Sequence, residues 1–427
     1  MSGYPILNSD PLEQLLSPAS DILNNYIRGV YLDGPLDDAK FLTCGVLRVC
    51  GQFSSGRDFI QHYREVFDQP MARSSFFQSL HSPRRRQLLA EVNSQMVARY
   101  QSQLPDLLGA FPQLRQRLIL AVDGHHLEHA THAPADPKGS FVSVNSLHVL
   151  CLHSGLLLNA AAVQGDGRYR HELPVFRQRA QDWLGQPRRG RPGPRPIFVV
   201  DPAFVDKVFW TLMRMAGQKG ALVITRTKAN MDPTIYGPRA FDPSDPLNEG
   251  VEADLRVGFD GAGLMRLVRY RDPESGAEYE FLTTVDDLPP GLIALIYLLR
   301  WRIEKLFDTA KNKLEESKSW AVGEVAQEIQ ARFLALTHNL MVLLRARLER
   351  ESGLREEKVE KKRQQVMIER QDKAQAKGRK VAYFQSLLPA VVQLTAQFIR
   401  TLRNGILTKM RWQTVLGHFR LAMKYYL

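Results

Sequence analysis

The sequence has few cysteines, and those present are not spaced as metal or redox ligands. Cys44, Cys50 and Cys151 are odd in number, and no two of them form a CxxC pair. The CxxC spacing is typical of zinc ribbons, so no zinc ribbon is expected. Cysteines this sparse and unpaired indicate a reducing compartment.

Long apolar runs are also missing. No stretch approaches the ~18 consecutive apolar residues that a membrane-spanning helix needs. The first residues, MSGYPILNSDPLEQLL, lack a basic segment followed by an apolar one, which is the pattern of a secretory signal. A soluble, cytoplasmic protein is therefore expected.

Two glycine-rich phosphate-binding patterns are absent. No GxxxxGK[ST] sequence occurs, which argues against a P-loop ATPase, and no GxGxxG sequence occurs, which leaves dinucleotide binding without support. The chain instead has an excess of positive charge, with 57 Lys and Arg against 45 Asp and Glu and a net charge of +12. This surplus suits a polyanionic partner such as nucleic acid, although ribosomal and membrane-surface proteins share it.

The 427 residues are enough for two or three domains. Residues 1–112 have apolar positions at helical spacing, and residues 113–345 alternate short apolar strands with helices. Within the second region, residues 229–290 contain several prolines and then alternating segments, which predicts a β-rich insertion. Residues 346–427 return to a helical pattern, first densely charged and then apolar. The pattern predicts an α/β core between helical N- and C-terminal regions.

Two of the predicted strands end in an aspartate. ILAVD ends at Asp123 and PIFVVD ends at Asp201. A carboxylate just past a buried strand is held at the edge of a sheet while its side chain reaches into a crevice. Either aspartate alone would be ambiguous, because many α/β folds place an acid there.

A polar stripe follows on the helix predicted after Pro290. Tyr297, Arg300, Glu304 and Lys311 are three, four and seven residues apart, so they project within an arc of roughly 60° on an α-helix. Ordinary pairing of residues four apart explains Arg300 with Glu304. It does not explain why Tyr297 and Lys311 extend the same stripe.

The spacing Tyr-x2-Arg-x3-Glu-x6-Lys resembles the YREK signature of the IS-four family of bacterial insertion-sequence transposases, and Tyr297 to Lys311 match it in full. The two upstream aspartates look like that family's catalytic pair. The resemblance implies an RNase H-like mixed-sheet core in which Asp123, Asp201 and Glu304 bind two Mg²⁺ ions, for which Mn²⁺ can substitute. Carboxylate oxygens suit such hard cations, which can serve the attacking and leaving oxygens of a phosphodiester.

The resemblance also implies cut-and-paste transposition in the bacterial nucleoid. Double-stranded DNA, as terminal inverted repeats and as target, would be the partner, and a homodimer would form the synaptic complex. Tyr297, Arg300 and Lys311 would contact phosphates, and Arg226 and Lys228 resemble a further DNA-binding pair. The N-terminal helices would bind the DNA ends, and the C-terminal helices would provide dimerisation or DNA contacts.

Competing residues and functions stay open at this stage. Asp308 lies one turn beyond Glu304 and is a second candidate acid. The segment DGHHLEHATH suggests a zinc site, but it lacks the HExxH arrangement and follows a strand, which favours loop histidines near phosphates; these are His125, His126, His129 and His132. An RNase H-like nuclease that no longer joins DNA and a catalytically silent DNA-binding regulator are the alternative functions.

Overall fold

The fold is known from a computed structural model of the chain. It describes residues 10–31, 33, 36–53, 55–67, 71–130, 144–163, 172–185, 195–217, 220–314, 318–353, 357–387 and 396–425.

A nine-stranded mixed sheet runs through the middle of the molecule, in the order β3-β2-β1-β4-β5-β9-β8-β7-β6. Its first five strands have the RNase H-like arrangement. β1 pairs antiparallel with β2 and parallel with β4, and β4 pairs parallel with β5. The predicted fold class is thereby confirmed. These strands are β1 (Ile119–Leu127), β2 (Val144–Cys151), β3 (Leu157–Val163), β4 (Ile197–Val200) and β5 (Leu222–Arg226).

The β-rich insertion extends this same sheet. β9 pairs antiparallel with β5, so the inserted strands continue the central sheet to its far edge. One of them, β6, lies in the proline-containing segment for which no strand was predicted. It ends at Pro238 on the sheet's outer edge, where a missing N–H breaks no ladder bond. The inserted strands are β6 (Thr234–Pro238), β7 (Val251–Gly258), β8 (Met265–Arg271) and β9 (Glu278–Thr283).

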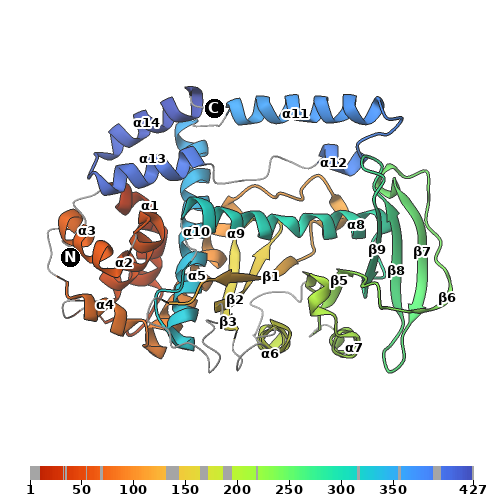
Figure 1. Cartoon of the computed structure of the whole chain (residues 1–427), viewed down its shortest axis with the longest axis horizontal. Helices are drawn as coiled ribbons and strands as arrows, with labels where there is room; N and C mark the ends of the chain where they lie inside the picture. The colour runs from red at the N-terminus through yellow and green to blue at the C-terminus, as the bar shows by residue number, and fades with distance from the viewer. Residues whose placement is uncertain are drawn as a thin grey trace.

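Helices cover both faces of the sheet (Figure 1). The apolar strands alternate between two cores: Ile119 and Ala121 of β1 pack on the side of α8, α9 and α10, and Leu120 and Val122 pack on the side of α6 and α7. A strand buried on both faces reads as a continuous apolar run, as β1 and β4 do. The covering helices are α6 (Glu172–Gly185), α7 (Lys207–Met215), α8 (Pro290–Leu299), α9 (Trp301–Lys313) and α10 (Glu324–Ser352).

The helix predicted after Pro290 is interrupted at Arg300, which corrects the prediction of one unbroken helix. The Arg300 N–H donates to the Tyr297 carbonyl at 3.0 Å, and the Ile303 N–H donates to the Arg300 carbonyl at 3.0 Å. Both bonds join residues three apart, so the chain tightens locally between α8 and α9. Arg300 keeps right-handed helical torsions, with φ −53° and ψ −33°.

Helices from both ends of the chain share one further core. The N-terminal helices pack with α10, α13 and α14 in a single apolar cluster beside the sheet (Figure 1), and α10 crosses position 345/346 without a break. The proposed division into 1–112, 113–345 and 346–427 stays a prediction. The helices are α1 (Asp10–Asn25), α2 (Asp38–Gly51), α3 (Gly56–Phe67), α4 (Arg73–Ser79), α5 (Pro83–Tyr100), α11 (Glu357–Gln375), α12 (Tyr383–Leu387), α13 (Ala396–Leu407) and α14 (Trp412–Tyr425).

Short 3₁₀ turns connect several elements: η1 (Gln101–Gln103), η2 (Pro112–Leu114), η3 (Pro202–Phe204) and η5 (Pro246–Asn248). None of the helices in the described part of the chain has both the length and the apolar character needed to cross a bilayer.

Candidate active site

The sheet places Asp123 and Asp201 next to each other. The parallel pairing of β1 with β4 ends at Val122 opposite Val200, so each aspartate is the residue that comes directly after this pair in its segment. Successive side chains alternate between faces, so both aspartates follow Ala121 and Val199 toward the side covered by α8 and α9. One expectation is corrected here. β1 does not end at Asp123, because its antiparallel pairing with β2 continues to Leu127.

Arg300 joins the two aspartates to Glu304. Its Nη1 donates to Asp123 Oδ2 at 2.9 Å, and its Nη2 donates to Glu304 Oε1. The same Nη2 lies 3.9 Å from Asp201 Oδ2. The structure therefore gathers all three predicted acids, from two strands and a helix, around one guanidinium.

The three acids differ in exposure. The side chain of Asp123 is 18% exposed, against 40% for Asp201 and 36% for Glu304. Burial raises the pKa of Asp123, which Arg300 and the Gly124 N–H only partly oppose, and Glu304 and Asp201 raise it further. Burial acts against the charge of Arg300, yet the neighbouring acids, Asp123 first, hold its pKa above the ordinary value. Negative charge is thus concentrated where a cation would be stabilised.

Sequence reasoning missed a fourth acid, Glu172, the first residue of α6. Its carboxylate lies against Gly124, where a Cβ would come within 1.7 Å of Glu172 Oε1, so a larger residue at position 124 would displace the carboxylate. Burial raises the pKa of Glu172; His126 opposes the shift, and Asp123 and Asp201 increase it. A lone glutamate opening a predicted helix carries no signal that would single it out.

The other predicted DNA-contacting residues divide into buried and exposed groups. Tyr297 is 7% exposed, and its ring lies 5.1 Å from that of Phe281. Burial raises its pKa. By contrast, Arg226, Lys228 and Lys311 are exposed and open to a ligand.

The four histidines were expected in a loop, and this is wrong for two of them, while His129 follows the strand. His125 and His126 lie within β1, because that strand is longer than predicted. His125 is buried and stacks on Phe307 with ring centroids 4.8 Å apart, so it is a core residue. His126 Nδ1 lies 2.6 Å from Asn145 Oδ1. His132 lies outside the described residues. Asp308, the competing acid, is exposed and away from the Arg300 contacts.

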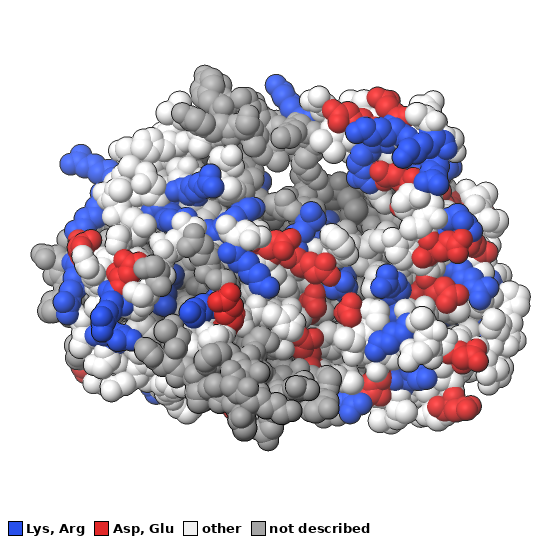
Figure 2. Space-filling model, in the orientation of Figure 1, with Lys and Arg blue, Asp and Glu red and all other residues white. Residues whose placement is uncertain are grey.

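Charge on this face of the molecule follows the same arrangement. Figure 2 shows acidic side chains gathered in the middle, where Figure 1 places α9 and the central strands. Lysine and arginine side chains predominate to the left, over the N-terminal helices, and both signs are mixed to the right, over the inserted strands. A basic surface beside an acidic centre suits a polyanion such as DNA, whose phosphates the cations attract.

The donor set fits hard divalent cations in its chemistry. It offers carboxylate oxygens from three separate segments, with Asp201 and Glu304 reachable from solvent. Within the described residues, no three acidic, histidine or cysteine side chains are clustered as a ready-made metal site. The carboxylates instead surround the Arg300 guanidinium, which supplies positive charge at their centre.

Comparison with known proteins bears on this site. A family model described as "Transposase DDE domain" matches residues 114–340. No curated protein matches the chain. Among solved structures, the piggyBac transposase synaptic complex with hairpin DNA, determined by cryo-electron microscopy, has 13% sequence identity and a TM-score of 0.40, over 94% of this chain and 83% of that one.

Proposed function

The chain belongs to the transposase DDE domain family, and we propose that it is a cut-and-paste DNA transposase of the IS-four type. Membership of the family makes it a phosphoryl-transfer enzyme. The proposed reaction is the binding of terminal inverted repeats, cleavage of the DNA strands at the element's ends, and transfer of those ends to target DNA. A homodimer would hold two ends together, and the bacterial nucleoid would be its location.

The observation that supports this best is the meeting of Asp123, Asp201 and Glu304 at Arg300. The three acids come from β1, from the residue after β4 and from α9, and their like charges repel one another, so the single charge of Arg300 compensates them only in part. Their convergence is understandable if they hold cations. We therefore propose them as the catalytic and metal-binding residues.

Two Mg²⁺ ions, or Mn²⁺ in their place, are the proposed cofactors. When bound, they would neutralise charge at the reacting phosphate and activate the attacking water or 3′-hydroxyl. The chain's own contribution is to fix the carboxylates: Asp123 by the sheet and by the Gly124 N–H, which donates to its Oδ1 at 2.9 Å, and Asp201 by donation of the Ala203 N–H to its Oδ1 at 2.9 Å.

DNA contacts are proposed for the exposed cations first. Arg226 ends β5, Lys228 follows it, and Lys311 lies on α9 beyond Glu304, so all three can reach phosphates beside the acids. The resemblance assigns phosphate contacts to Tyr297 and Arg300 as well. In this structure both are buried, so such contacts would require their side chains to move when DNA binds.

Arg300 provides a test of the metal proposal without DNA. In Arg300→Gln the three acids lose their shared cation, which is expected to cost about 1–3 kcal/mol without metal. Divalent ions then no longer compete with a guanidinium. Addition of Mg²⁺ or Mn²⁺ is therefore expected to raise the Tm of this variant more than that of the wild type, as measured by calorimetry.

The matched control is Lys305→Gln, an exposed cation on the same helix. It is expected to respond to Mg²⁺ as the wild type does. An equal rise in Tm for wild type and Arg300→Gln would show that Arg300 does not share the carboxylates with metal ions.

The proposed function is tested with a supercoiled plasmid that carries the flanking inverted repeats, in the presence of Mg²⁺. Excision followed by insertion into a second plasmid is expected. Cleavage without joining would identify a nuclease, and binding without cleavage would identify a regulator. Either result would replace the proposal.

A further inference from the structure

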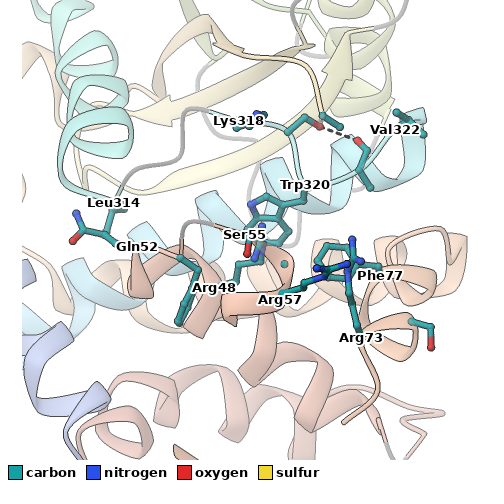
Figure 3. Close-up of a pocket in the computed structure, with 16 residues that line it drawn as sticks. Arg48, Gln52, Ser55, Arg57, Arg73, Phe77, Leu314, Lys318, Trp320 and Val322 are labelled. Carbon is teal, nitrogen blue, oxygen red and sulfur yellow. Dashed lines mark hydrogen bonds between the residues drawn. The ribbon is translucent and has the colours of Figure 1, made fainter. Parts of the chain in front are cut away.

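A cavity of about 710 Å³ lies between the N-terminal helices and the segment that follows α9 (Figure 3). It is separate from the three acids, and neither the sequence pattern nor the family assignment gives it a role. Its walls come from α2, α3 and α4 on one side and from residues around Trp320 on the other. A volume of this size is typical of small-molecule and cofactor sites.

Cations line the cavity. Arg48, Arg57, Arg73 and Lys318 all face it, and among the wall residues that the structure describes none is Asp or Glu. Arg57, Arg73 and Lys318 are exposed, and no ion pair among the described residues uses them. The like charges of these three exposed side chains repel one another. An anion would relieve that repulsion.

Two aromatic side chains, Trp320 and Phe77, line the cavity beside these cations. The Arg48 guanidinium carbon lies 5.0 Å from the ring centroid of Trp320 and 5.6 Å from that of Phe77. That of Arg73 lies 5.6 Å from the Phe77 centroid. Figure 3 shows Trp320 reaching toward Arg48, with Arg57, Arg73 and Phe77 grouped beside them.

Trp320 is held in place by the chain around it. Its backbone N–H donates to Gln330 Oε1 at 2.9 Å, and Gln330 Nε2 donates to the Lys318 carbonyl at 3.0 Å. Its ring also lies 6.0 Å from the ring of Phe333 in the buried core. The wall is therefore formed before any ligand arrives, which lowers the entropy cost of binding.

We propose that this cavity binds an unpaired nucleotide of a DNA strand, with its base against Trp320 and Phe77 and its phosphates on Arg57 and Arg73. Aromatic side chains accept the face of any base, and arginines beside them hold the backbone, which is how proteins bind single strands without reading their sequence. The proposal rests on the proposed function, because it takes DNA as the partner.

Two short stretches of chain link the wall of the cavity to the catalytic acids. Leu314, on its wall, is ten residues beyond Glu304, or about 15 Å along a helix. Ser319, also on the wall, donates its N–H to the Glu128 carbonyl at 2.9 Å, and Glu128 is five residues beyond Asp123. A strand cut at the acids could therefore place a base in the cavity only a few nucleotides away, since the rise is about 3.4 Å per nucleotide along a duplex strand.

The first experiment measures the affinity of the full chain for a 12-nucleotide single strand and for the matching duplex, by fluorescence anisotropy. Arg57→Gln combined with Arg73→Gln is expected to weaken single-strand binding at least tenfold. It is also expected to reduce the salt dependence of log K by about 1.4, the loss of two phosphate contacts to a single strand. Duplex binding is expected to change no more than in the control.

The matched control is Arg400→Gln combined with Arg420→Gln, two exposed arginines on α13 and α14 that remove the same charge. If both double variants weaken single-strand binding equally, the cavity has no special role and the proposal is overturned. Cleavage of donor DNA by the wild type would still stand in that case. A wild type that binds neither strand form would instead overturn the proposed function.

A second experiment uses only the wild-type protein, so its result does not depend on whether a variant folds. A single strand carrying 5-iododeoxyuridine is crosslinked to the wild-type protein by light, and the labelled peptide is identified by mass spectrometry. Crosslinks to Trp320 or Phe77 are expected, and crosslinks confined to other segments would overturn the proposal. Deoxyadenosine monophosphate alone is expected to bind far more weakly than the strand. Equally tight binding would identify a free-nucleotide site instead.

Discussion

Asp123→Asn is expected to abolish strand cleavage while the protein remains folded. The amide keeps the volume of Asp123 and an oxygen for the Gly124 N–H, but it removes the charge beside Arg300. Since residues of one catalytic unit act together, loss of a single member is expected to lower the rate by on the order of 10³ or more. Nicking of supercoiled donor DNA with Mg²⁺ measures the rate. Circular dichroism and Tm report the fold.

The matched control is Asp308→Asn, which removes a carboxylate of the same kind one turn beyond Glu304. Asp308 is exposed and contacts neither Arg300 nor the two aspartates. The nicking rate of Asp308→Asn is expected to equal that of the wild type. Wild-type nicking by Asp123→Asn, or loss of nicking in Asp308→Asn alone, would show that the acids are assigned wrongly.

The meeting of the two aspartates could be predicted because it depends on local pattern and on one rule of sheet geometry. Each aspartate follows an apolar strand, and parallel strands bring their carboxyl ends to one edge. The structure adds the register, which pairs Val122 with Val200 and so aligns Asp123 with Asp201. Register is set by packing on both faces of the sheet, which periodicity alone does not specify.

The features that were missed depend on contacts distant in sequence. β1 continues past Asp123 because β2 remains beside it, and His125 and His126 therefore lie in a strand. The interruption at Arg300 is not marked by a proline or glycine beside it in the sequence. Glu172, on α6, lies beside Gly124 of β1, where the absence of a Cβ leaves space for its carboxylate. None of these pairings has a signature within a window of the sequence.

For Arg300 the helical spacing predicted one contact correctly but did not indicate the others. Its spacing from Glu304 predicted a shared helix face, and the two residues do contact each other. The same guanidinium also bonds Asp123, 177 residues away, which helical periodicity cannot indicate. Its position as the shared partner of three acids makes it a structural part of the site as well as a candidate DNA contact.

A second large effect, on the free energy of unfolding, is expected from Asp254→Ala in the β-rich insertion. Asp254 on β7 and Arg266 on β8 form a bidentate pair, with Nε to Oδ1 at 2.8 Å and Nη2 to Oδ2 at 2.7 Å. Both side chains are only 2% exposed. Removal of the acid leaves a buried guanidinium with its charge uncompensated, which is expected to cost about 3–5 kcal/mol. Calorimetry and pulse proteolysis measure the loss.

The control is Glu252→Ala on the same strand, where the partner Arg271 and the acid are both about half exposed. Exposed pairs contribute about 0–1 kcal/mol, so little change is expected. Replacement of the buried pair by apolar residues, as Asp254→Leu with Arg266→Met, is expected to recover much of the lost stability, because no charge remains buried. Equal losses for Asp254→Ala and Glu252→Ala would contradict this account.

Loss of the Asp254–Arg266 pair is also expected to affect the active site. Arg266 Nη1 also donates to the carbonyls of Val285 at 3.2 Å and Leu288 at 2.7 Å, which lie between β9 and the start of α8. The pair therefore fixes the point at which the chain leaves the inserted strands and enters the helices that carry Arg300 and Glu304. Asp254→Ala is expected to lower donor cleavage even at temperatures where the protein is folded, while Glu252→Ala leaves it unchanged. Full cleavage activity in folded Asp254→Ala would mean that α8 and α9 are positioned by the central sheet alone.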